Sequence, residues 1–394
     1  MTRTADIPIA RRLADLVAIP SVNPMGVAHA GPEPVERGVV RFLEAFFADA
    51  DADVTLTRQR VSDAHENLLI AMPGAHDAPG LLFESHMDTV PAAEWGDAAF
   101  QPLVDGRRVV GRGACDDKGS LLAMAIALRR VLDRGVRPPA PIWLLAAADE
   151  EYAQTGIQHF ARGFAGRLRG AVFGEPTQLS PIVAHKGIVR WDLTVHGRSA
   201  HSARPELGVN AILGMRRVLD AIAHVERELQ QRFIAPLVGG PTLTVTRIQG
   251  GRTRNAVPDA CTIALDVRIV PGMEPAETRE TIVSLLAALD HVDLSHGETQ
   301  VAMRPLDTAM EAPFSREVLR ACQAVTGADA AFAGVPYGTD AAWFPADVPA
   351  IVLGPGDIAT AHTAREEIDV AEVEQAVEIY TRLMLSASAL DEGP

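Results

Sequence analysis

The sequence predicts an α/β protein built on a mostly parallel, helix-covered sheet, interrupted by a smaller α+β domain. Short apolar runs alternate with amphipathic segments up to about residue 180 and again after about residue 304, the order that builds parallel sheets with helices on both faces. Between these stretches, long segments alternate apolar and polar residues, as expected for a sheet with one open face. A length of 394 residues also favours two domains, because one core rarely exceeds roughly 250–300 residues.

In the first stretch, apolar residues at helical spacing predict helices, and uninterrupted apolar runs predict buried strands. Pro20 and Pro24 end the first helix, and Pro91 follows a buried strand that it cannot continue. Helices are expected over 7–19, 35–48, 121–132 and 155–164. Strands are expected over 54–58, 67–72, 80–85, 108–110, 141–148 and 170–174.

The middle stretch has a different order of elements. It is expected to form strands over 187–196, 242–248, 261–270 and 298–303, with helices over 208–230 and 277–289. Strand-helix-strand-strand-helix-strand is the order of a small two-layer sandwich. The alternation of helices and strands of the first stretch then resumes with a helix over 315–326, a strand over 349–353 and a helix over 371–385. We therefore predict a main domain of 1–182 and 304–394, with an inserted domain of 183–303.

The composition argues against several classes of protein. A net charge of −15 disfavours nucleic acid or an anionic membrane as a partner, since either requires a clustered positive field. The longest apolar runs, such as 121–128, are shorter than the roughly 18 residues of a membrane span. The three cysteines Cys115, Cys261 and Cys322 cannot all pair, which indicates a reducing compartment. With no secretory segment visible, we expect a cytoplasmic protein.

Histidines and acidic residues follow the ends of several apolar strands. His86 and Asp88 point to the same side of an extended segment, so the carboxylate can orient the imidazole, as is common behind a metal-bound histidine. The carboxyl ends of parallel strands meet along one edge of a sheet, where such folds bind ligands. Candidate ligands with this placement are His86, Asp116, an acid of 149–151, Glu175 and His362.

Two histidines and three carboxylates suit zinc, cobalt or manganese. Five ligands fit two metals if one carboxylate bridges them and a water lies between. Such metals lower the pKa of water from 15.7 toward about 7 and polarise a carbonyl oxygen. Of the neighbours Glu150 and Glu151, one can coordinate while the other reaches the water as general base. The plainer alternatives are an ordinary strand end at His86 and Asp88, and a solvated acidic turn at 149–151.

Distinctive short motifs occur in order between residues 85 and 362. They include His-Met-Asp-Thr-Val-Pro at 86–91, Asp-Glu-Glu at 149–151 and Gly-Glu-Pro-Thr at 174–177. The others are 111–119, 184–187, 196–202, 208–212, 250–255 and 353–362. Together they resemble the M20 family of metallopeptidases and deacylases, and within it most closely the acetylornithine deacetylases.

The resemblance implies two divalent metal ions, with zinc as the leading candidate and cobalt or manganese as alternatives. Asp116 would bridge them, His86 and Glu175 would complete one site, and Glu151 and His362 the other. The inserted domain would be the family's lid and dimerisation module, so a homodimer is expected.

The resemblance also implies roles for residues that do not bind metal. Glu150 would be the base, and Asp88 would steer the metal-bound histidine. His201 on the lid would stabilise the oxyanion, from its own subunit or the partner's, although taken alone it is more simply a surface or capping histidine. Arg268 would grip the substrate carboxylate, a bidentate task that suits arginine, and Asn255 would contact substrate nearby. If the resemblance is set aside, Arg268 is interpreted as an exposed charged residue on a strand.

Three positions depart from the deacetylase pattern. Asp340 stands where those enzymes often carry a glutamate, which changes how a substrate's side-chain amine would be held. Asp117 stands where the family commonly has methionine, and His362 is followed by Glu366-Glu367 instead of the usual Asp-Glu.

We predict a metal-dependent amidohydrolase that removes the N-acyl group of an N-acyl-L-amino acid through a metal-bound hydroxide. N-acetylornithine is the leading substrate. An M20 dipeptidase, an aminoacylase and a succinyl-diaminopimelate desuccinylase-like enzyme are the alternatives within the family. A non-catalytic relative that binds amino acids is the alternative from another class.

Overall fold

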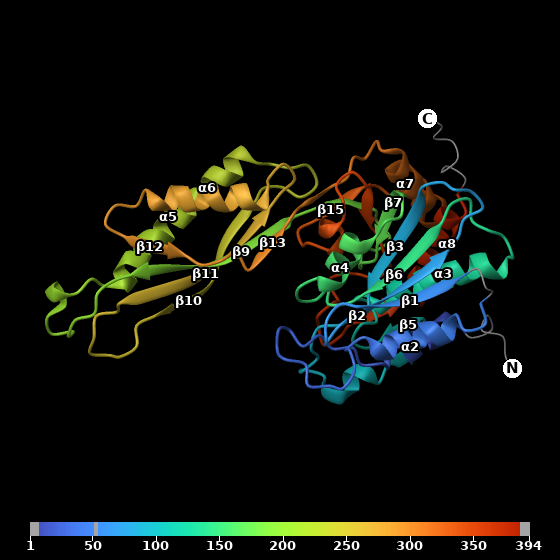
Figure 1. Cartoon of the computed structure of the whole chain (residues 1–394), viewed down its shortest axis with the longest axis horizontal. Helices are drawn as coiled ribbons and strands as arrows, with labels where there is room; N and C mark the ends of the chain where they lie inside the picture. The colour runs from blue at the N-terminus through green and yellow to red at the C-terminus, as the bar shows by residue number, and fades with distance from the viewer. Residues whose placement is uncertain (1–7, 51–53, 387–394) are drawn as a thin grey trace. The chain divides into compact units, whose positions relative to one another are not determined.

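The computed structural model describes residues 8–50 and 54–386 (Figure 1). The described chain divides into two compact units. Unit 2 comprises Ala184–Asp307 and Gly334–Gly338, and the remainder forms unit 1.

The largest sheet has nine strands and is mixed. Its order is β1-β2-β6-β3-β7-β16-β8-β14, with β15 also paired to β8. The four strands β6, β3, β7 and β16 are mutually parallel, whereas β1, β2 and β8 run antiparallel to their neighbours. The strands are β1 Thr55–Arg60, β2 Glu66–Met72, β3 Gly80–His86, β6 Ile142–Ala147, β7 Leu168–Phe173, β8 Ile182–His185, β14 Leu306–Asp307, β15 Ala333–Val335 and β16 Ala350–Val352.

The predicted α/β class is confirmed, but only the centre of the sheet is parallel. β1 and β2 are joined by a short loop, which allows only antiparallel pairing. The four parallel strands are linked through long connections that include helices.

Helices cover both faces of this sheet (Figure 1). On one face, α3 and α8 share a core cluster with Phe83 of β3, and Tyr380 packs edge-to-face on Phe83 with ring centroids 5.8 Å apart. On the other face, Trp143 of β6 packs edge-to-face on Phe164 at the end of α4. The helices of unit 1 are α1 Ile9–Val17, α2 Arg37–Phe46, α3 Lys118–Asp133, α4 Thr155–Gly163, α7 Pro313–Thr326 and α8 Val370–Met384, with short 3-10 turns η2 Gly96–Phe100 and η4 Asp340–Trp343.

A separate three-stranded sheet contains β4 (Leu103–Asp105), β5 (Arg108–Val110) and β17 (Glu367–Asp369), in the order β17-β5-β4. The sequence predicted the 108–110 strand but treated it as part of the main sheet, which is wrong. Its partner strand β17 comes from near the end of the chain, and nothing local in the sequence indicates that pairing.

Unit 2 contains a sheet of order β10-β11-β9-β12, with β13 also paired to β9. Helices α5 and α6 lie on one face (Figure 1), where Trp191, Leu193 and Val195 of β9 are buried in the core cluster. The Asn210 side chain caps α5 by accepting the amides of Ile212 and Leu213, and just before the helix the backbones of Arg198 and Val209 form an antiparallel bridge. The elements are β9 Gly187–His196, η3 Pro205–Leu207, α5 Ala211–Arg232, β10 Thr242–Gly250, β11 Ala260–Ile269, α6 Pro275–Ala287, β12 Asp293–His296 and β13 Val301–Met303.

The strand predicted over 298–303 corresponds to β13, which begins only at Val301, and β12 was not predicted. Two strands, β12 and β13, pair with successive parts of β9. Between them the chain leaves regular pairing at Gly297, whose amide donates to the carbonyl of Asp192 at 2.8 Å.

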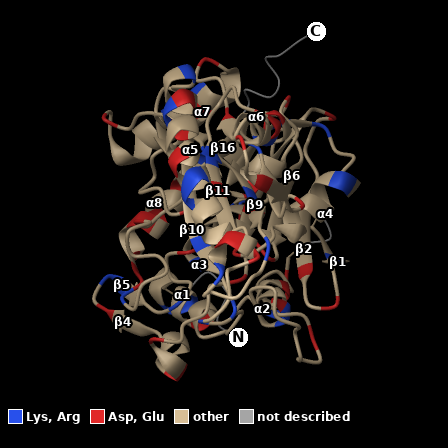
Figure 2. Ribbon diagram, turned by 90° about the vertical axis from the view of Figure 1, so that its left-hand side faces the viewer, with Lys and Arg blue, Asp and Glu red and all other residues tan. Residues whose placement is uncertain are grey.

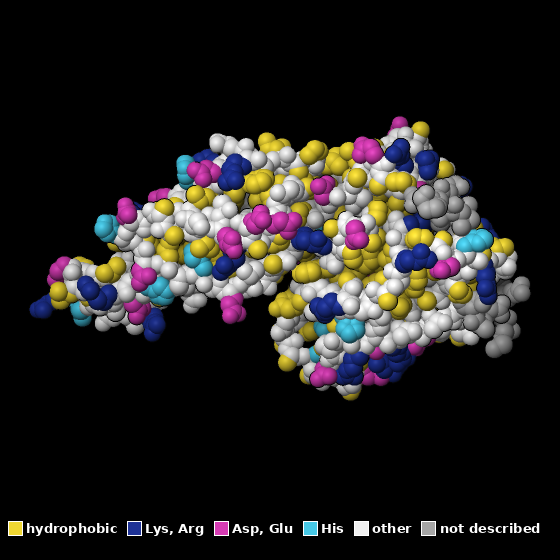
Figure 3. All heavy atoms as spheres, turned by 45° about the horizontal axis from the view of Figure 1, so that its top comes forward, with side chains coloured by type: hydrophobic (Ala, Val, Ile, Leu, Met, Phe, Trp, Pro, Cys, Tyr) yellow, Lys and Arg dark blue, Asp and Glu magenta, His cyan; other side chains and the backbone are white. Residues whose placement is uncertain are grey.

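Charged and apolar residues are both spread over the surface. Acidic and basic residues are interspersed along the ribbon (Figure 2), and hydrophobic side chains are exposed between charged groups on the face that Figure 3 presents. Within the described residues, no helix has both the length and the apolar character needed to cross a membrane.

Candidate metal centre

Strands β3 and β6 leave the sheet side by side, because they pair in parallel with His86 opposite Ala147. The Nδ1 atom of His86 lies 3.0 Å from the Asp88 carbonyl oxygen and 3.6 Å from its Oδ1 atom. This contact occupies Nδ1 and leaves Nε2 available to bind a metal. The Asp88 carboxylate also accepts the amides of Glu150 at 3.1 Å and Glu151 at 3.2 Å. Asp88 therefore holds both the imidazole and the acidic turn after β6.

Asp116 lies between two histidines. Its Oδ1 atom is 2.9 Å from Nε2 of His86, and its Oδ2 atom is 3.1 Å from Nε2 of His362. Nε2 of His362 is also 3.2 Å from Oε2 of Glu151. One carboxylate thus presents a different oxygen to each imidazole, which is the arrangement that a bridging ligand requires.

A second group of donors adjoins the first. Donor atoms of His86, Glu150 and Glu175 lie within 4.8 Å of one another, as do those of His86, Asp116 and Glu151. Glu175 follows the end of β7, the strand beside β3. The five residues predicted as ligands therefore come together, and Glu150 joins them.

The charges of these groups favour a bound cation. Burial, followed by repulsion from neighbouring carboxylates, raises the pKa of Glu175 well above its usual value, and burial raises that of Glu151. Burial opposes protonation of His86, but its bonds to Asp116 and Asp88 outweigh this and raise its pKa. Hydrogen bonds to Asp116 and Glu151 raise the pKa of His362 to about 10.

Nitrogen and carboxylate donors at this spacing fit divalent ions of the zinc type. A cation among the carboxylates would relieve their mutual repulsion without protons. The residues present therefore fit the two-metal centre that the sequence predicted.

The loop that carries Asp116 does not extend from the main sheet. It connects β5 of the small sheet to the first turn of α3, and the peptide bond between Asp116 and Asp117 is cis. The sequence argument placed Asp116 at the edge of the parallel sheet. The residue does reach that edge, but from another sheet.

Asp340 is buried with 2% of its surface exposed. Burial raises its pKa to about 8, against the opposing attraction of His86. Glu84 is itself 2% exposed and lies two residues before His86 on β3. Asp340 is therefore surrounded by protein. Its contact with a substrate amine stays a prediction.

The predicted residues of unit 2 lie near two of its strands. His201 forms a bridge with Ala256, and the amide of Ser202 donates to the carbonyl of Asn255 at 2.9 Å, so His201 and Asn255 lie on adjacent segments. Arg268 is on β11 and donates from Nε to Oδ1 of Asp266 at 2.7 Å.

The sequence analysis missed residues that support the centre. Asn23 donates to Asp88 at 2.8 Å and to Asp149 at 2.9 Å, and Gln154 donates to Glu150 at 2.8 Å. The position of Asn23, a polar residue between two prolines, could have indicated its supporting role. Nothing in the sequence around Gln154 indicates such a role. Glu366 was noted only as a departure from the family pattern.

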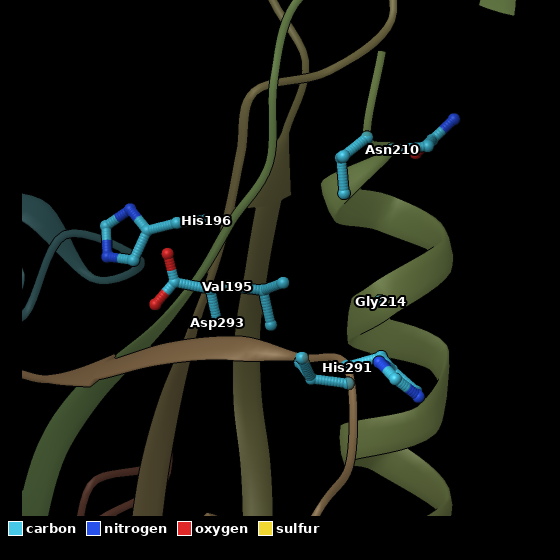
Figure 4. Close-up of a pocket in the computed structure, with 8 residues that line it drawn as sticks. Val195, His196, Asn210, Gly214, His291 and Asp293 are labelled. Atoms are coloured by element: carbon cyan, nitrogen blue, oxygen red, sulfur yellow. The ribbon is translucent and has the colours of Figure 1, made fainter. Parts of the chain in front are cut away.

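A hollow of about 310 Å³ lies in unit 2, at the end of β9 and the start of α5. It is lined by two histidines and an aspartate, but the rings of His196 and His291 point in opposite directions (Figure 4). Among the described residues, the clusters of three or more potential metal ligands are both in unit 1. We assign no chemistry to this hollow.

Imidazoles and carboxylates gathered beside the carboxyl ends of the parallel strands are the donors that a metal-dependent hydrolase needs. Residues 82–386 match Peptidase family M20/M25/M40, and the chain belongs to that family, as predicted. It is a metallohydrolase acting on amide bonds.

Individual relatives agree with this assignment. An acetylornithine deacetylase of Yersinia pseudotuberculosis serotype O:1b (strain IP 31758) is 30% identical over 381 residues, covering 94% of this chain and 95% of the relative. The M20 family metallo-carboxypeptidase Sso-CP2 from Sulfolobus solfataricus shares the fold with a TM-score of 0.75 at 17% identity, covering 98% of this chain and 99% of that one. The Bacillus subtilis YXEP protein, a dinuclear metal binding peptidase from the M20 family, gives a TM-score of 0.67 at 14% identity, with 95% and 96% covered.

Proposed function

We propose that this hydrolase removes the N-acyl group of an N-acyl-L-amino acid, with N-acetylornithine as the leading substrate. The observation that carries the proposal is Asp116, whose two oxygens face two imidazoles within a group of buried carboxylates. The choice of acyl amino acid is supported by the 30% identity to an acetylornithine deacetylase over 94% of the chain.

The proposed ligands divide into two sets that share Asp116. His86 and Glu175 complete one, and Glu151 and His362 complete the other. Zinc suits these donors, and cobalt or manganese is also compatible with them. When bound, such ions supply an acidified water and polarise the scissile carbonyl.

Glu150 is proposed to move the proton. Its Oε1 atom accepts a hydrogen bond from Gln154 at 2.8 Å, and Gln154 is held in turn by Nε1 of Trp343 at 2.7 Å. The carboxylate is therefore oriented, and burial raises its pKa well above the usual value. A carboxyl group of raised pKa can take a proton from water and deliver it to the departing amine nitrogen.

His201 is proposed to donate to the developing oxyanion. Its Nδ1 atom accepts the amide of Ala203 at 3.1 Å, so the neutral ring carries its proton on Nε2 and offers a donor there. One such donor is worth roughly 10²–10³ in rate.

Arg268 is proposed to bind the substrate carboxylate. Asp266 accepts Nε of Arg268 at 2.7 Å and Nε of Arg190 at 2.6 Å. These bonds orient the Arg268 side chain while leaving its two terminal nitrogens available. Asn255 and Asp340 are retained as proposed substrate contacts.

Unit 2 is proposed to be the lid and dimerisation module of the family. Among the described strands its outer strand β10 pairs on one side only, with β11, and two apolar residues there are exposed: Ile248 on β10 by 55% and Ile212 at the start of α5 by 43%. Ile212 also lies against Gly250 at the end of β10. Light scattering should give the mass of a dimer, and Ile248→Arg should shift it toward a monomer. A monomeric wild type would remove this part of the proposal.

The substrate proposal is tested by comparing kcat/KM across N-acetyl, N-succinyl and longer N-acyl amino acids and a set of dipeptides. N-acetylornithine should rank first, and Glu150→Ala, assayed in parallel, controls for contaminating activity. Preference for a dipeptide would replace the deacetylase by a dipeptidase. Metal binding with no turnover of any substrate would favour the non-catalytic alternative.

A further inference from the structure

Glu366 is a fully buried carboxylate that the proposed chemistry does not use. Its Oε1 atom accepts the backbone amides of Cys115 and Asp116, each at 3.0 Å. Its Oε2 atom accepts Nη1 of Arg112 at 2.5 Å. All three contacts fall on the loop that carries the proposed bridging ligand.

Arg112 is as deeply buried as its partner, with 1% of its surface exposed. Its guanidinium lies 5.7 Å from the ring centroid of Trp95, and its amide donates to the carbonyl of Ala99 at 2.9 Å. The loop that carries Asp116 is thus fixed at Arg112, and Glu366 is held against that fixed point by a desolvated ion pair.

Glu366 also belongs to the segment that carries His362. Its carbonyl accepts the amide of Gly111 at 3.0 Å, and β17 begins at the next residue and pairs with β5, with Glu367 opposite Val110. The segment after His362 is therefore joined to the segment before Asp116 by backbone pairing. The Glu366 side chain extends this junction to the Asp116 amide itself.

The placement of His86 does not depend on this junction. His86 is placed by the parallel register of β3 and β6 and by its contact with Asp88. His362, in contrast, is on a loop with a positive φ of 59°, and its side chain is 52% exposed.

We propose that Glu366 is a positioning residue that sets the distance between Asp116 and His362, and so determines the affinity of the second metal ion. The inference rests on the two-metal centre proposed above. Outer partners of this kind typically change metal affinity by 10–100-fold when removed.

The test is a calorimetric titration of the metal-free full-length chain with Co²⁺, following the cobalt absorption bands in parallel. The wild type should bind two ions. Glu366→Ala should weaken the second by 10–100-fold, with an altered cobalt spectrum, while the first stays within about 3-fold. The matched control is Glu367→Ala, which removes the same charge from the next residue, whose partner is the exposed Arg108. It should titrate like the wild type.

A second pair of variants separates the acceptor role of Glu366 from the ion pair. Arg112→Met with Glu366→Gln removes both charges but keeps an oxygen for the two amides, and should bind the second ion within a few-fold of the wild type. Arg112→Met with Glu366→Met removes the oxygen and should not. If Glu366→Ala does not fold, the two double variants test the inference in its place.

Three results would overturn the inference: equal loss of both ions in Glu366→Ala, a titration indistinguishable from that of Glu367→Ala, or equal binding by the two double variants. A wild type that binds no cobalt would instead overturn the metal centre itself, and the inference with it.

Discussion

Replacing Asp88 by asparagine should weaken metal binding without altering a single proposed ligand. The carboxylate accepts three hydrogen bonds from its surroundings: from Asn23 at 2.8 Å and Glu151 at 3.2 Å on Oδ2, and from the Glu150 amide at 3.1 Å on Oδ1. Asparagine has one oxygen, so its amide nitrogen must face at least one of these donors.

The expected size of the effect follows from that count. If the asparagine oxygen takes the place of Oδ2, one buried N–H loses its acceptor, and if it takes the place of Oδ1, two do. Each buried donor left unpaired costs about 1–3 kcal/mol, so the free energy of unfolding of the metal-free protein should fall by at least about 1 kcal/mol. Loss of the charge beside His86 should lower metal affinity by about 10–100-fold, or roughly 1.4–2.7 kcal/mol.

Calorimetric zinc titration and urea unfolding measure these two quantities. Asp63→Asn is the matched control, because Asp63 is exposed and forms an ion pair with the exposed Arg60, and it should match the wild type in both. Metal affinity within about 2-fold of the wild type in Asp88→Asn would refute the idea that Asp88 orients His86.

Three other predictions concern single residues. Glu150→Ala should keep its metal, measured by elemental analysis, while kcat falls by several orders of magnitude; unimpaired turnover would remove Glu150 as the base. Arg268→Met should raise KM for acyl amino acids more than it lowers kcat, while Arg247→Met, which removes an exposed arginine paired with Asp192, should leave KM unchanged; equal effects would discount Arg268. Burial lowers the pKa of His185 to about 4 from 6.5, so its neutral form stabilises the fold above pH 6.5 and this contribution is lost as pH falls toward 4, by up to about 3 kcal/mol. His185→Asn should unfold in urea with a shallower loss of stability over that window, and an identical pH dependence would contradict the assignment.

The sequence predicted most of the fold because periodicity and proline positions are local signals. The pattern of β9 was clear, since one face is buried and the other open, and the run ending at His86 was clear because it is apolar on both faces. Pairings between distant segments were not predicted. The association of β17 with β5 and that of β12 with β9 depend on which strand lies alongside, and a single sequence does not show this.

The sequence predicted which residues form the candidate site but not the hydrogen bonds that hold them in place. Histidines and acids after apolar strands were visible, and the structure brings His86, Asp116 and His362 together. Asp116 arrives from the small sheet, so part of the reasoning that placed it was wrong. The bonds of Asp88 to the amides of Glu150 and Glu151 were not predictable, because they depend on the register of β3 against β6.

Asp116 as a bridge between two divalent ions is the claim on which the chemistry depends. The most direct test is the number of zinc ions that the metal-free chain takes up at saturation, measured by elemental analysis and calorimetry for the wild type and for Asp116→Asn. Two ions per wild-type chain, with both bound far more weakly in the variant, is the predicted result. A single ion in the wild type, or an Asp116→Asn variant that retains both at unchanged affinity, would contradict the account.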